Sequence, residues 1–82
     1  MKTIDILNKM EIGLPIVVIL NNKIRCVSIY LGNNGAGTYK FIDDSGIYEC
    51  TTGYIKEHIT LDEIKDDMEL MQVVKLIEKI KK

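Results

Sequence analysis

The side chains best suited to chemistry in this sequence are Cys26, Cys50 and His58. Thiolate and imidazole groups are preferred zinc ligands, and a Cys–His pair can form a nucleophile with its base. A structural zinc site requires four ligands at short spacings, whereas here the cysteines are isolated and no second histidine is present. The sequence therefore predicts small buried thiols, no metal, no cofactor and no catalytic residues.

An acidic cluster, Asp43, Asp44 and Glu49, is the next candidate. Paired carboxylates can transfer protons or hold a hard cation. The two aspartates come directly before a Ser-Gly pair, however, and aspartate in such a position commonly accepts hydrogen bonds from its own backbone. We therefore expect these side chains to shape a turn.

Residues 32–37 form a glycine- and asparagine-rich segment, Gly-Asn-Asn-Gly-Ala-Gly, whose backbone N–H groups could cradle an anion. A Walker loop requires lysine and then serine or threonine after its last glycine, but Thr38 and Tyr39 follow here. A dinucleotide-binding loop opens a helix, whereas a strand pattern follows this segment. We predict a hairpin loop. The alternative is a mobile loop that contacts a ligand or partner through Asn33, Asn34 and Gly35.

Five aromatic residues, four tyrosines and Phe41, fall within the strand-rich part of the chain. Aromatic side chains on a small sheet can stack nucleic-acid bases. Residues 16–59 hold four basic and four acidic residues, which is a poor balance for binding a phosphate backbone. We therefore expect packing in a core, and a nucleic-acid-binding small barrel is the alternative function.

Apolar patterning indicates the elements that position these residues. It predicts a helix over residues 3–12, capped by Thr3, then strands over 16–20, 24–31, 38–43 and 47–51, and a short fifth strand over 54–59. The expected fold is α+β, with a single domain over residues 1–82. It is a four- or five-stranded antiparallel meander or small SH3-like barrel, flanked by a short N-terminal helix and a long C-terminal helix.

The C-terminal helical pattern runs from Thr60 to the last residue, and its apolar face changes sides halfway. The first stripe is formed by Leu61, Ile64, Met68 and Met71. The second stripe, on roughly the opposite side, is formed by Leu70, Val73, Val74, Ile77 and Ile80. Thr60 and Glu63 match a capping box, and Asp66 and Glu69 repeat its spacing. Either one continuous helix buries its second stripe on a partner, or the helix breaks near residue 66 and both stripes join one core. In either case Leu61, Ile64 and Met68 of the first stripe should pack on the chain's own sheet.

Composition limits the classes of function. The net charge of −1 offers no electrostatic attraction for nucleic acid or an anionic membrane. The longest apolar run, residues 16–20, is too short to span a membrane, and the N-terminus lacks a signal-peptide pattern. Two separated cysteines favour the reducing cytoplasm. The abundance of isoleucine, lysine and asparagine is typical of proteins encoded by an AT-rich genome, such as that of a bacterium, phage or plasmid.

These observations predict a small non-catalytic interaction module that forms a homo-oligomer, most simply a dimer, or binds a host protein. A phage- or plasmid-encoded inhibitor or adaptor fits this description. The expected interface is the second stripe of the C-terminal helix: Leu70, Val73, Val74, Ile77 and Ile80.

Overall fold

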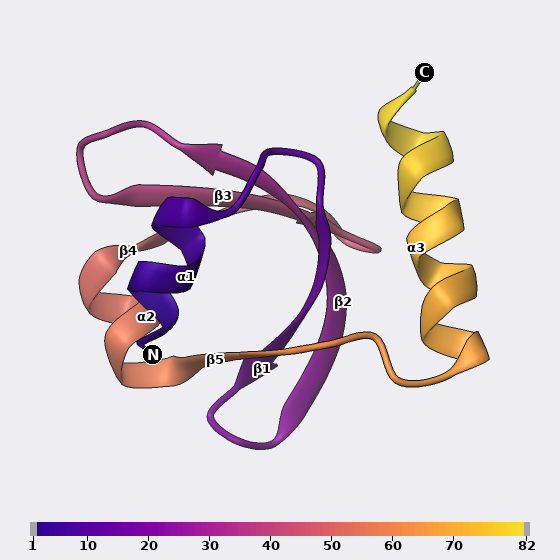
Figure 1. Ribbon diagram of the computed structural model, residues 1–82, viewed down its shortest axis with the longest axis horizontal. Coiled ribbons are helices and arrows are strands. Elements are labelled where there is room, and N and C mark those ends of the chain that lie inside the picture. Colours follow the sequence, from indigo (N-terminus) through magenta and orange to yellow (C-terminus); the bar gives the residue numbers. More distant parts are fainter. Residues whose placement is uncertain (1, 82) are drawn as a thin grey trace.

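The structure, a computed structural model, describes residues 2–81 as three helices and a five-stranded antiparallel sheet (Figure 1). In chain order the elements are α1 (Thr3–Lys9), β1 (Pro15–Leu20), β2 (Ile24–Asn33), β3 (Thr38–Asp43), β4 (Gly46–Thr51), α2 (Thr52–His58), β5 (Ile59–Asp62) and α3 (Asp67–Ile80). The predicted α+β class and antiparallel meander are confirmed.

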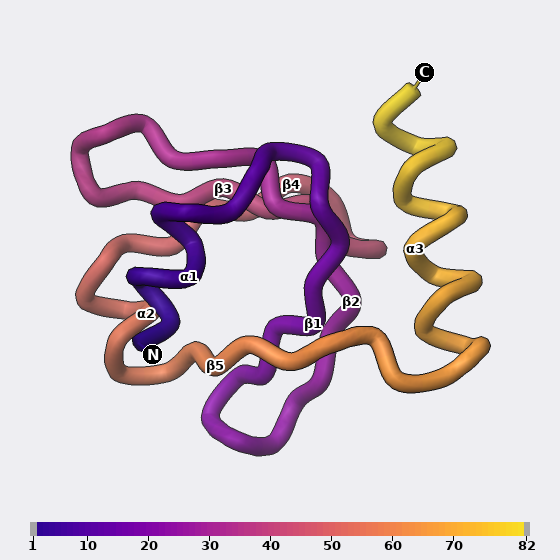
Figure 2. Tube along the Cα trace, in the orientation of Figure 1, coloured from indigo at the N-terminus to yellow at the C-terminus, as the bar shows by residue number. Residues whose placement is uncertain are grey.

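The strands lie in the order β4-β3-β2-β1-β5. The first four strands pair with their sequence neighbours. Helix α2 then carries the chain from one edge of the sheet to the other, where β5 pairs with β1 (Figure 2). Because β4 and β5 occupy opposite edges, the sheet is open and does not close into a barrel.

The β1–β2 hairpin shows how local sequence sets the strand register. Asn21 and Asn22 both adopt positive φ, at 52° and 58°, and the Lys23 N–H donates to the Leu20 carbonyl at 3.0 Å. Two consecutive left-handed residues define a type I′ turn, whose twist matches that of the flanking strands. Residues 21–23 therefore form a tight turn.

Helices cover both faces of the sheet (Figure 1). On the side of α1 and α2, the core contains Leu7, Val18, Tyr30, Tyr39, Phe41, Cys50, Ile55 and Ile59. On the side of α3, it contains Val17, Val27, Ile29, Ile42, Val73 and Leu76. Successive residues of a strand point to opposite faces, so the apolar run in β1 supplies both cores at once.

The first helix is shorter than predicted, because α1 ends at Lys9 and the chain turns toward the sheet from Met10. Thr3 does not cap it. Lys2 occupies the N-cap position, and the Thr3 hydroxyl donates to the Ile59 carbonyl at 3.1 Å. This bond ties the start of α1 to β5, far along the chain.

The strand predicted over residues 54–59 is wrong. Residues 52–58 form α2. Thr51 caps its N-terminus, because the Thr51 hydroxyl accepts from the Tyr54 N–H at 3.3 Å. Ile55 of this helix is fully buried and belongs to the core on the side of α1 and α2. Of residues 54–59, only Ile59 belongs to a strand, as the first residue of β5.

The helix predicted from Thr60 is also wrong in both forms, because residues 60–66 are not helical; only a helix that begins near residue 66 is observed. Thr60 pairs with Ile19 as part of β5, and α3 begins only at Asp67. Of the two capping patterns, the one at Asp66 and Glu69 begins the helix, since the Asp66 carboxylate accepts from the Glu69 N–H at 2.8 Å. The helix ends at Ile80, and residue 82 lies outside the described residues.

The first apolar stripe is therefore divided among different surroundings. Leu61 packs on the core beneath α1 and α2, and Ile64 packs on the core beneath α3. Met68 was expected on the sheet, but it is 74% exposed on the first turn of α3.

Candidate interaction surface

The structure brings the two cysteines to one small cavity, where residues 2–81 provide no activating partner. Cys26 and Cys50 line a cavity of about 180 Å³ with Tyr48 and Tyr54, below the roughly 300–1,000 Å³ typical of ligand pockets. Burial raises the pKa of both thiols, and nearby Asp43 adds to the effect at Cys26. A thiol with a raised pKa is a weak nucleophile near neutral pH.

Two of the remaining candidates for metal or acid–base chemistry, His58 and Asp43, are engaged in structural contacts. His58 Nδ1 lies 2.6 Å from Asn21 Oδ1 and so joins α2 to the β1–β2 turn. The Asp43 carboxylate accepts from the Ser45 N–H at 2.8 Å, as expected for a turn aspartate. Within residues 2–81, no three His, Cys, Asp or Glu side chains are grouped as a metal site.

The asparagines of the glycine-rich loop bond within their own hairpin. Asn33 Oδ1 accepts from the Gly35 N–H at 3.0 Å, and Asn34 Oδ1 accepts from the Ala36 and Thr38 N–H groups. The Asn33 amide also donates to the Tyr30 hydroxyl at 3.2 Å. These contacts favour the hairpin-loop interpretation of residues 32–37, because the polar groups are already used to hold the turn.

The aromatic residues form a packed cluster. Phe41 is 1% exposed, with its ring centroid 5.5 Å from that of Tyr30 and 5.4 Å from that of Tyr48. Burial raises the pKa of Tyr48 to about 12, and its hydroxyl lies 3.0 Å from the buried Ser28 hydroxyl. Tyr54 is exposed, but its ring packs at a tilt against that of His58, with the ring centroids 4.7 Å apart. The aromatic faces that could stack on nucleic-acid bases are thus largely packed against other residues inside the protein.

Helix α3 is well specified by its own sequence. Asp66 caps its N-terminus, Asp67 and Glu69 lie in its first turn, and Lys79 lies in its last. This charge order complements the helix dipole. Val73 and Leu76 are 5% and 1% exposed and pack on the face of the sheet that α3 covers.

A second side of α3 is apolar and exposed. Leu70 is 54% exposed, Met71 61%, Val74 50% and Ile77 37%. We call these four residues the α3 flank. At 100° per residue, three of them (Leu70, Val74 and Ile77) lie within about 60° of one another on the helix, away from the buried side.

The structure places the predicted interface residues in two environments. Val73 belongs to the chain's own core, whereas Leu70, Val74, Ile77 and Ile80 remain exposed. Met71 was missed because it fits the spacing of the first apolar stripe. Because residues 60–66 are not helical, Leu61 and Ile64 do not continue a stripe through Met71, which lies about 60° from Val74 on the helix.

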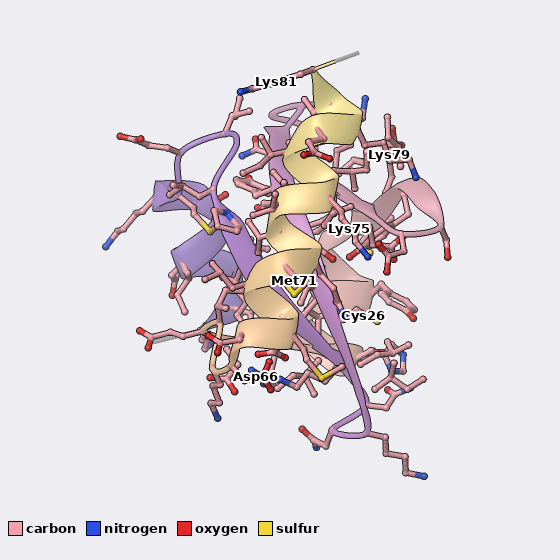
Figure 3. The ribbon with its side chains drawn as sticks, turned by 90° about the vertical axis from the view of Figure 1, so that its right-hand side faces the viewer. Cys26, Asp66, Met71, Lys75, Lys79 and Lys81 are labelled. Carbon is pink, nitrogen blue, oxygen red and sulfur yellow. The ribbon has the colours of Figure 1, made fainter. Side chains whose placement is uncertain are left out.

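The lysines of α3 lie on the other side of the helix from most of the α3 flank. Viewed from outside, Lys75 and Lys79 extend to one side and Met71 lies near the middle of the helix (Figure 3). Lys79 Nζ donates to the Asp44 carbonyl at 3.3 Å, which ties that side to the β3–β4 turn. The apolar side is therefore left open.

One arginine anchors the start of α3 to the sheet. The Arg25 guanidinium in β2 donates to the Asp62 carboxylate at 2.6 Å, to the Glu63 carbonyl at 2.8 Å and to both oxygens of Glu69. Hydrogen bonds from Arg25 lower the pKa of Glu69, and bonds from Lys65 and Arg25 lower that of Asp62. A planar guanidinium suits this multiple pairing.

The pairing predicts a pH-dependent stability. Because both carboxyl groups have lowered pKa values in the folded state, their stabilising effect is present above about pH 4 and is lost as the pH falls further. We expect Arg25→Gln to lower the Tm near neutral pH and the difference from wild type to shrink below about pH 4. Circular dichroism at several pH values measures this.

Lys40→Gln is the matched control, since its pairing with Glu49 at 3.6 Å is much more exposed. It should change the Tm little. An Arg25→Gln difference that stays constant from neutral to acid pH would contradict the role assigned to these carboxylates.

Comparison of the chain with protein-family models, curated proteins and solved structures gave no match. Among residues 2–81, no helix has both the length and the apolar character needed to cross a membrane.

Proposed function

We propose that this chain is a non-catalytic interaction module that binds another protein chain through the α3 flank. The observation that carries the proposal is the exposure of Leu70, Met71, Val74 and Ile77 on a helix whose neighbouring side is already packed on the sheet. A contiguous apolar surface on a small protein is typical of a protein-binding site.

Two further observations support binding over catalysis. The two thiols have raised pKa values, and the histidine is held by an asparagine. The module would act as an adaptor or inhibitor by occupying a partner's surface. Its two unbridged cysteines fit a reducing cytoplasm, where we place it.

The test is photo-crosslinking in cells that produce the full chain. A benzophenone amino acid replaces Val74 on the α3 flank or, as a control, Ile47, which is 63% exposed on β4. We expect an adduct of discrete mass from position 74 and none from position 47. Adding Leu70→Glu should remove the adduct without unfolding the protein, since Leu70 is half exposed.

The absence of an adduct at position 74 would contradict the proposed function. So would equal adducts at both positions, because they would indicate unspecific contact. The mass of a specific adduct tells whether the partner is a second copy or a different protein.

A further inference from the structure

We propose that the partner bound by the α3 flank is a second copy of this chain, with the two α3 helices antiparallel about a two-fold axis at Val74. This inference rests on the proposed function and names its partner.

The exposed side of α3 has the spacing of a helix-pairing seam. Asp67, Leu70, Val74, Ile77 and Lys81 follow one another at intervals of three, four, three and four residues. This spacing keeps side chains on one line along a helix, where they can interdigitate with a second helix. Three apolar residues form the middle of the line, and a charged residue closes each end.

The order of charges favours the antiparallel arrangement. With Val74 on the axis, Leu70 of one copy lies beside Ile77 of the other, and Asp67 lies beside Lys81. Each dimer would then contain two such Asp–Lys pairs. A parallel pair would place Asp67 against Asp67 and Lys81 against Lys81, which is repulsive. Antiparallel helix dipoles also attract one another.

The size of the surface predicts the strength of pairing. A 14-residue helix is about 21 Å long. A standard interface of about 800 Å² per partner would cover roughly one-seventh of the 5537 Å² surface of this chain. One flank of one short helix covers less, so we expect a reversible dimer with a micromolar Kd.

Sedimentation of the full chain over a wide concentration range tests self-pairing. We expect a concentration-dependent monomer–dimer equilibrium. Lys81→Asp or Asp67→Lys should each weaken the dimer by about threefold or more, and the double variant should restore it. Circular dichroism of each variant confirms that α3 remains folded.

Disulfide trapping tests the orientation. Val74→Cys should form a homodimer readily, and Leu70→Cys should join to Ile77→Cys when the two variants are mixed. Wild type, with its buried Cys50 and partly buried Cys26, gives the background. Preferential joining of Leu70→Cys to itself would show parallel pairing and overturn the antiparallel proposal.

The two proposals fail differently. A chain that stays monomeric at about millimolar concentration overturns self-pairing. If position 74 then still gives an adduct with a different protein, the α3 flank remains a binding surface. If it gives none, both proposals fail.

Discussion

Replacing Phe41 with alanine should lower the free energy of unfolding by about 3–5 kcal/mol. The side chain is 1% exposed, and its ring lies between those of Tyr30 and Tyr48. Truncation would remove both ring contacts and leave a cavity that β3, held between two neighbouring strands, cannot close. Urea unfolding followed by circular dichroism measures the change.

Ile47→Ala is the matched control for this core. Ile47 lies on the neighbouring strand β4 but is 63% exposed, so its truncation should cost about 0.5 kcal/mol or less. Similar losses for both variants would show that the aromatic cluster is not the centre of the core.

Leu76→Ala should lower the free energy of unfolding by about 2–5 kcal/mol. Leu76 is 1% exposed and belongs to the cluster formed by α3 with Val17, Val27 and Ile29 of the sheet. The loss should appear in a single transition for helix and sheet, because the same strands supply both cores.

Val74→Ala is the comparison within the same helix. Val74 is half exposed, so its truncation should leave the monomer's stability nearly unchanged and weaken only pairing of α3. If Leu76→Ala melted the helix while the transition of the sheet stayed in place, α3 would be an appendage and not part of the cooperative fold.

The sequence predicts the first four strands well because their signals are local. The strand expected over residues 38–43 is observed with those bounds, and the others differ by no more than two residues at either end. Asn21-Asn22 and Asp43 to Gly46 form turns through their own backbone preferences. Alternating apolar residues between such turns leave few other ways to pair.

Elements fixed by distant contacts could not be predicted in the same way. Thr60 and Leu61 fit a helical pattern as well as a strand pattern, and only pairing with Ile19 and Val18 of β1 decides between them. Helix α2 is short and contains Gly53, so its own helix propensity is weak. It is stabilised by burying Ile55 in a core built mostly from the rest of the chain.

The candidate surface was only partly predictable for a related reason. Apolar spacing identified α3 as carrying more apolar residues than one core needs. Which of them face the sheet depends on how the helix is rotated about its axis, and Arg25 in β2 helps to set that rotation by holding Glu69. Val73 was therefore placed in the interface and Met71 outside it.

Because β5 lies at an edge of the sheet, the C-terminal part of the chain is expected to be less stable to local unfolding than the rest. This four-residue strand pairs only with β1, and α3 follows it across residues 63–66. Residues 59–81 can therefore open together as a sub-global unfolding unit while β1–β4 keep their mutual hydrogen bonds. Amide hydrogens in β2 and β3, which are paired on both sides, would then exchange last, and those of the C-terminal quarter would exchange earlier.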